Sequence, residues 1–363
     1  MTHLKMYSYL SLQSYYLYCS SGLEEFWAQR MCAVSNLKAH SIARKSLIRT
    51  FLFTVVMLIL GSRFDAYNQA QLALVLILFI GVLSVTILTG ISGQLSLGQG
   101  ALMAVGGYST ALMMINYKLS LWIAIPLSII SAGIAGLLLG VAAARLSGPY
   151  LAGTTLVIAL AIPTLANRFM SVFKGDEGLP VDVGYPPAWF SNTFGEPSYE
   201  KWQIYVALPF AAIALFFASN ILLSRSGRMW RAIRDNELAA SLNGVNYSRQ
   251  KIYVFIVSAT FAGLSGALYG LRGLVGPSVY PVSLSLTLLT AAVLGGIRSI
   301  SGAFIGTVIV VYLPDWIEKA LGNFSLSEQV SNFLPALISS LLLILVVVIN
   351  PAGVAGTRLH KHK

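Results

Sequence analysis

The densest set of chemically active side chains lies in residues 224–251, which read SRSGRMWRAIRDNELAASLNGVNYSRQK. Six residues of this segment are basic and two are acidic, and Arg228, Arg231, Arg234 and Glu237 recur at every third position. A three-residue step aligns such side chains along one side of a helix. Guanidinium and carboxylate groups on one face form charge-assisted hydrogen bonds to a partner. The segment predicts a docking element, and a solvated basic loop that only sets topology is the alternative.

The second half of this segment predicts a change of direction. Ala239, Ala240 and Leu242 supply small apolar positions to the first helix, and Gly244 follows them. Glycine after the last helical residue ends a helix with a left-handed turn. Asn246 is then placed to cap a second short helix. We therefore expect a helix–Gly–helix unit between two membrane segments.

A second set of polar side chains predicts a path for a small solute. Gln94, Ser96 and Gln99 stand in a glycine-rich stretch between two apolar runs, and Thr154 and Thr155 lie near the start of another. Amide and hydroxyl groups can replace water around a zwitterion or an amide, and weak binding lets the solute leave again. The same residue types also form hydrogen bonds between helices, which is the alternative.

Several absences exclude other chemistry. No phosphate-binding GxxxxGK[ST] loop occurs, all four His lie in the tails, and Cys19 and Cys32 form no CxxC pair. We predict no catalytic residue, no metal site and no bound cofactor. Asp315, at the end of one apolar run, is the only acid in the expected membrane spans, which argues against proton coupling and less strongly against sodium coupling.

The elements that position these residues are predicted from composition and uncharged runs. Hydrophobic residues make up 56% of the chain and charged residues 10%, and the mean hydropathy is +0.74. A membrane-spanning helix needs about 20 apolar residues. The prediction is an all-α, polytopic helical bundle with some broken or half helices. Its about ten spans are expected near 47–62, 69–90, 93–115, 121–144, 150–170, 203–223, 252–273, 283–297, 300–316 and 331–350.

Charge placement predicts how the chain is organised around the bilayer. With both termini in the cytoplasm, the inside collects most of the 24 Lys and Arg residues and the outside most of the 13 Asp and Glu residues. The net charge of +11 then sets topology, and no nucleic-acid partner is expected. We divide the chain into an extension over 1–43, a permease domain over 44–352 containing the loop 224–251, and a basic tail over 353–363. We assign no function to the extension. Two alternatives for its structure, a disordered tail and an amphipathic lead-in, remain open.

Three GxxxG pairs fall within the expected spans. They are Gly136/Gly140, Gly266/Gly270 and Gly302/Gly306. Small residues let helix backbones approach closely in lipid. We expect packing within the chain at these pairs, with a contact between subunits as the alternative.

Four ordered segments resemble the permeases of branched-chain amino-acid ABC transporters. The loop is similar to that family's A-I-R-D-x-E-x-A-A-x-x-x-G pattern and carries Leu238 where the general loop of ABC importers has a glutamate. The matching residues are Ala232, Ile233, Arg234, Asp235, Glu237, Ala239, Ala240 and Gly244. The other three segments are SGQLSLGQGALMAVGGYSTALMM (92–114), LSGPYLAGTTLVIAL (146–160) and LGGIRSISGAFIGTVIV (294–310).

This resemblance implies a set of partners and roles. It implies that this chain lies in the cell membrane with a homologous second permease, two cytoplasmic ATPase subunits that bind the ATP, and an extracytoplasmic solute-binding protein. It also implies ATPase coupling for a set that we give as Arg231, Arg234, Asp235, Glu237, Ala239, Ala240 and Gly244. Branched-chain or other hydrophobic amino acids are the leading substrates, with urea or short amides as the alternative. An ATPase-independent carrier or channel and a membrane-anchored scaffold are the remaining classes.

Overall fold

The computed structural model describes most of the chain. It covers residues 44–146, 148–182, 184, 186, 190 and 198–321, together with 337, 338, 340, 341, 344, 345, 348 and 353–355. The chain divides into a unit ending at Arg49 and a unit beginning at Thr50, and α2 to α13 all belong to the second. The predicted extension 1–43 and nearly all of the predicted tail lie outside the described residues.

Seven helices of the described part are long and apolar enough to cross a membrane. They are Arg44–Arg63, Ala66–Ile91 (α2, Ala66–Val85, continued by the π-helix η1, Thr86–Ile91), α4 (Leu121–Ala143), α5 (Pro149–Arg168), α8 (Tyr199–Leu223), α11 (Tyr247–Gly270) and Ile300–Ala320 in α13 (Ile300–Leu321). The predicted polytopic helical fold is confirmed. The predicted number of about ten membrane spans was approximate. α3 (Gln99–Tyr117) is less apolar, α12 (Val282–Gly295) is shorter, and 331–350 falls largely outside the described residues.

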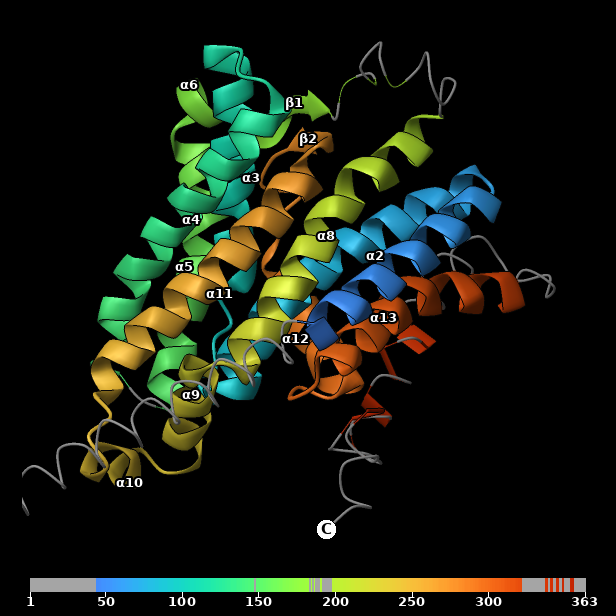
Figure 1. Ribbon diagram of the computed structural model, residues 1–363. Helices are drawn as coiled ribbons and strands as arrows, with labels where there is room; N and C mark the ends of the chain where they lie inside the picture. Colours follow the sequence, from blue (N-terminus) through green and yellow to red (C-terminus); the bar gives the residue numbers. More distant parts are fainter. Residues whose placement is uncertain are drawn as a thin grey trace, which may run out of the picture. The chain divides into compact units, whose positions relative to one another are not determined.

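Helix α11 forms the centre of the bundle, where it packs against α4, α3 and α2 (Figure 1). At Gly266 of α11, a Cβ would stand 1.8 Å from the carbonyl oxygen of Met103 in α3. At Gly136 of α4, a Cβ would stand 2.3 Å from that of Ala259 in α11. Lipid provides no hydrophobic drive between helices, so close approach is what gains dispersion contacts. The expected packing within the chain is confirmed at these glycines.

Buried hydroxyls also join α11 to α2. Ser258 Oγ donates to the carbonyl oxygen of Ser84 at 2.9 Å, and Ser265 Oγ donates to that of Ile77 at 2.7 Å. Both serines are fully buried. Hydrogen bonds between helices in lipid contribute about 0.6–2 kcal/mol each. The central helix is thus held by polar contacts as well as by close packing.

The connections form two structured ends. At one end, α6 (Met170–Phe173) and η2 (Gly175–Glu177) precede β1 (Leu179–Asp182), which pairs antiparallel with β2 (Arg272–Val275). At the other end are α9 (Arg225–Asp235) and α10 (Glu237–Leu242), between α8 and α11 (Figure 1). The 25 residues of α8 rise about 37 Å at 1.5 Å per residue, enough to cross a bilayer. The strand pair and the α9–α10 pair are therefore assigned to opposite sides of the membrane.

An interruption separates α2 from α3. The π-helix η1 ends at Ile91, residues 92–98 are not helical, and α3 begins at Gln99. The predicted helical span 93–115 is wrong over its first six positions, because Gly93 takes a φ of 75° that turns the chain out of the helix. Non-helical backbone at membrane depth is tolerated where protein covers it. Ser92, Gln94 and Ser96 are all buried in this segment.

Candidate coupling site and solute path

The loop 224–251 folds into two short helices with side-chain caps. Asn236 Oδ1 accepts the backbone N–H of Ala239 at 2.9 Å and starts α10. Gly244, with a φ of 78°, turns the chain after α10. Asn246 Oδ1 then accepts the N–H of Arg249 at 3.1 Å and starts α11. The predicted Gly turn and Asn cap are confirmed, but the first helix breaks at Asn236, and the second is the long α11 rather than a short helix.

The arginines of α9 bind the ends of other helices. Arg228 Nη1 donates to the carbonyl oxygen of Leu223 at 3.1 Å, and Arg231 Nη2 donates to that of Leu222 at 3.0 Å. Both acceptors lie in the last turn of α8, where carbonyl groups lack helical partners and carry partial negative charge. Arg231, which we predicted as a coupling contact, is therefore used within the chain to hold α9 against α8.

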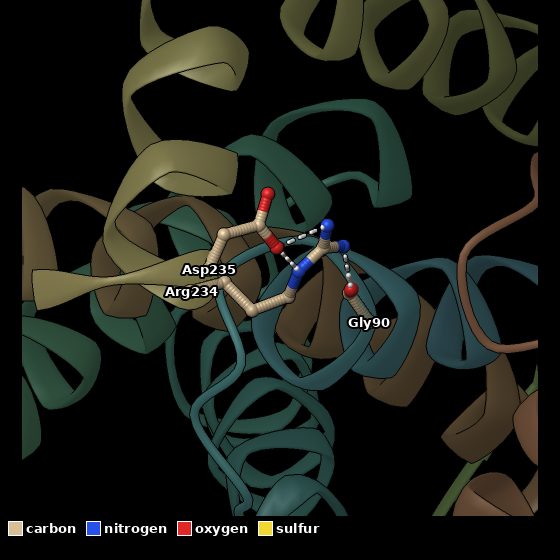
Figure 2. A network of polar contacts seen from close by, with 3 residues as sticks. All are labelled: Gly90, Arg234 and Asp235. Carbon is tan, nitrogen blue, oxygen red and sulfur yellow. Dashed lines mark hydrogen bonds and ion pairs between the residues drawn. The ribbon is translucent and has the colours of Figure 1, made fainter.

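Arg234 makes the longest-range contact of the loop (Figure 2). Its Nη1 donates to the carbonyl oxygen of Gly90 in η1 at 3.0 Å, while its Nε and Nη2 donate to Asp235 Oδ1 at 2.9 and 2.8 Å. The Arg234 side chain is 16% exposed and that of Asp235 is 66% exposed. The carboxylate thus orients a planar donor group toward the backbone of η1, a geometry suited to arginine.

Gly93 leaves the space that the side chain of Arg234 occupies. A Cβ at Gly93 would stand 2.5 Å from Cγ of Arg234. A side chain at this position would therefore displace the arginine, in addition to the strain of a positive φ. A cavity of about 290 Å³ lies beside this contact and is lined by Gln94 and Leu95 on one wall and Ile233 and Glu237 on another.

Glu237 at the start of α10 pairs with Lys251 of α11. Lys251 Nζ lies 2.8 Å from Glu237 Oε1, and the two side chains are 5% and 50% exposed, respectively. A buried ammonium group is costly unless a partner compensates it. The pair therefore holds α10 to the central helix of the bundle.

Removing Glu237 alone should destabilise the protein more than removing both partners. Glu237→Ala leaves the buried Lys251 ammonium uncompensated, and we expect a loss of about 1–3 kcal/mol. Glu237→Ala combined with Lys251→Met should recover most of that loss, since methionine keeps the apolar stem without the charge. Thermal aggregation of the purified chain in detergent measures both variants, and a double variant less stable than Glu237→Ala would contradict this account.

Two exposed leucines were not assigned a role from the sequence. Leu238 and Leu242, one turn apart on α10, are 70% and 81% exposed. Ala239 beside them is exposed, whereas Ala240 faces inward and is buried. The spacing of the two leucines was the available signal, because positions i and i+4 share a helix face. Together they form an apolar knob on the outside of the loop, which we name the leucine knob.

Among the predicted path residues, Gln99 is placed at the centre of the bundle. It is 1% exposed, and its Oε1 lies 3.1 Å from Ser84 Oγ in α2 and 3.4 Å from Ser258 Oγ in α11. Gln99 in α3 thereby links three helices. These contacts are the interhelical bonds that were the alternative to a solute role. Its Nε2 is buried without a hydrogen-bond partner.

The other predicted path residues divide between the interruption and α5. Thr155 Oγ1 accepts the backbone N–H of Leu97 at 3.0 Å and so joins α5 to residues 92–98. Ser96 Oγ accepts the N–H of Gly98 at 3.3 Å, and the buried Gln94 Oε1 has no hydrogen-bond partner. Thr154 is exposed and bonds only to carbonyl oxygens of its own helix. Four of the five residues therefore gather at the interruption, and Thr154 does not.

Metal binding finds no support in the part of the chain that the structure describes. No group of three or more His, Cys, Asp or Glu side chains there could hold a metal ion. The site instead consists of a capped helix pair, an arginine seated on a π-helix, and buried amides and hydroxyls at a helix interruption.

A bundle of membrane-crossing helices with an interrupted helix and a capped helix pair on one side defines a multi-pass membrane transport subunit. The chain belongs to the family described as the permease component of branched-chain amino acid transport systems, which matches residues 69–349. The resemblance noted from the sequence motifs is thus confirmed.

Three permease proteins are among the relatives most similar to this chain. The branched-chain amino acid permease protein LivM of Escherichia coli K12 is 31% identical over 289 residues, covering 73% of this chain and 68% of that protein. LivM of Salmonella typhimurium is 33% identical over 248 residues, covering 63% and 58%. LivH of Salmonella typhimurium, another permease protein of such a system, is 27% identical over 288 residues, covering 75% and 88%. No solved structure matches the chain.

Proposed function

We propose that this chain is one membrane-spanning subunit of an ATP-driven importer for branched-chain or other hydrophobic amino acids. Its proposed partners are a second, homologous permease, two cytoplasmic ATPase subunits and an extracytoplasmic solute-binding protein. Two related permease proteins, named LivM and LivH, support the pairing of unlike permeases. We place the α9–α10 pair in the cytoplasm and the chain in the plasma or inner membrane.

The observation that carries the proposal is the form of the α9–α10 pair. It is rigidly capped, fixed to α8, η1 and α11, and presents the leucine knob on its outside. Exposed apolar side chains that are rimmed by polar groups mark sites of protein association. A partner that hydrolyses ATP could move such a unit as a whole, because its contacts run into the bundle.

An apolar cavity supports the proposed class of substrate. About 360 Å³ of space lies between α3, α5 and α6, lined by residues that include Leu112, Ile162, Leu165, Phe169 and Phe173. Such a lining accommodates branched or aromatic side chains and offers little to a small polar amide, since apolar pockets gain by removing apolar surface from water.

Reconstitution tests the proposal directly. The chain is placed in liposomes with the ATPases, second permease and binding protein that its neighbouring genes encode, and uptake of labelled leucine, valine and urea is measured. We expect leucine or valine to accumulate only when ATP is supplied on the side of the liposome membrane that carries the ATPases. The chain alone should transport neither. Accumulation by the chain alone, driven by an ion gradient, would contradict the proposal, and preferential urea uptake would contradict the substrate class.

A further inference from the structure

Arg234 is the side chain through which the α9–α10 pair reaches the interruption in the membrane. Its guanidinium group uses Nε and Nη2 on Asp235 and Nη1 on the carbonyl oxygen of Gly90. The Arg234 side chain is 16% exposed and that of Asp235 is 66% exposed, so water competes less for the hydrogen bond to Gly90 than for the two to Asp235. A displacement of the end of α9 is therefore passed to the backbone of η1.

The backbone that Arg234 holds is suited to a change of shape. In η1 the helix is widened, and π-turns of this kind mark functional positions in helices. The turn is closed by Ser92 N–H to the Ile87 carbonyl oxygen at 3.3 Å and Gln94 N–H to that of Leu88 at 3.2 Å. These distances lie at or just beyond the upper end of the usual N–H···O range. The non-helical residues 92–98 follow directly.

Gly90 is confined on two sides. A Cβ there would stand 1.8 Å from the carbonyl oxygen of Ile297, in the turn between α12 and α13. Arg234 occupies another side of Gly90, and its methylene groups rest on Gly93. The end of η1 therefore contacts both α9 and the α12–α13 turn.

The space for a movement exists beside these contacts. The cavity of about 290 Å³ is lined by Ser92 to Leu95 on the interruption and by Ile233 to Glu237 on the loop. Packed interfaces move between discrete arrangements rather than by continuous deformation. The cavity between the two elements permits such a step without opening the apolar core.

We propose that Arg234 is a positioning residue that transmits the movement of the α9–α10 pair to residues 92–98. In this scheme, an ATPase that is bound to α10 moves α10 and α9 together. Arg234 moves the end of η1 with α9, and the interruption that contains Gln94 and Ser96 opens or closes. Asp235 fixes the orientation of the guanidinium group, and Gly93 allows it to seat. This inference rests on the proposed function, since it requires a nucleotide-dependent partner.

The test measures opening of the interruption rather than transport. Ser96→Cys, nearly isosteric with the native residue, is introduced after Cys19 and Cys32 are replaced by serine. Ser96 is 3% exposed, so a maleimide should label the cysteine only when the segment opens. Labelling is compared in the reconstituted complex without nucleotide and with ATP trapped at the ATPases, and we expect the two rates to differ by about tenfold.

Three further substitutions in that background decide the role of Arg234. Arg234→Lys keeps the charge but replaces the planar donor fork that spans Asp235 and Gly90 with a single ammonium group, and Gly93→Ala displaces the arginine. We expect both to reduce the nucleotide-dependent difference to about twofold or less, with ATP hydrolysis and complex assembly retained. Arg228→Lys is the matched control, because Arg228 lies on the same helix without touching η1.

The outcomes are distinguishable. A full nucleotide-dependent difference in both Arg234→Lys and Gly93→Ala would overturn the role of Arg234 while leaving the importer intact. An equal loss in Arg228→Lys would overturn it also, because the effect would then come from α9 in general. A Ser96→Cys parent that binds no ATPase would overturn the proposed function and, with it, the inference.

Discussion

Replacing Gly266 by alanine should destabilise the folded protein more than the other substitutions considered. The added Cβ would stand 1.8 Å from the carbonyl oxygen of Met103, which is far inside van der Waals contact. The obstacle is backbone of α3 rather than a flexible side chain, so α11 and α3 must separate. Overpacking of a core costs about 1–3 kcal/mol, and we expect a loss at or above the upper end of that range. Thermal aggregation and the yield of folded protein in detergent measure it.

Gly153 of α5 provides a matched control for this substitution. It is also a helical glycine in a membrane span, but a Cβ there would meet nothing within 4 Å. Gly153→Ala should therefore leave stability unchanged or raise it slightly, because alanine is the better helix former by about 1 kcal/mol. Equal stability of the Gly266→Ala and Gly153→Ala proteins would show that α11 and α3 are not packed as described.

Removing the leucine knob should strongly weaken association with the proposed ATPase subunits. Leu238 and Leu242 are mostly exposed in the isolated chain, and burial of a leucine side chain in a partner contributes about 1.5–3 kcal/mol. Loss of both should weaken binding by about 100-fold or more. We expect the Leu238→Ala, Leu242→Ala protein to fold normally and to lose ATP-dependent uptake. Retention of the ATPases during purification, followed by titration, measures the effect.

Leu138 of α4 is the control for the leucine knob. It is 68% exposed, close to the value for Leu238, but it lies on a membrane helix rather than in the loop. Leu138→Ala should leave ATPase binding unchanged. Full binding by the double variant of Leu238 and Leu242 would exclude the leucine knob as the docking surface, and the charged residues of α9 would have to take that role.

Much of the fold could be predicted from the sequence because the membrane imposes a simple code. Long uncharged runs must become helices, since no water is present to bind free backbone groups. The same code gives no sign of a break inside an uncharged run. Residues 92–98 contain no charge, and only Gly93 and Gly98 hinted that α3 would begin as late as Gln99.

The turn and the helix cap of the loop could be predicted from the sequence, but the partners of its charged side chains could not. Gly244 and Asn246 act locally, so their residue types sufficed to predict a turn and a cap. Arg231 and Arg234 could equally have faced a partner or the carbonyl ends of other helices. Their acceptors, Leu222 and Gly90, become neighbours only in the folded bundle. The choice between the two therefore depends on tertiary structure.

The central position of α11 has a consequence for biosynthesis. Its packing partners α2, α3 and α4 are all translated before it, and proteins emerge from the ribosome N-terminal part first. Until α11 is inserted, the hydrogen bonds of Ser258 and Ser265 and the close packing at Gly266 are missing from the nascent bundle. Quality-control proteases that act on incomplete membrane proteins would therefore meet this chain chiefly in the interval before α11 is inserted.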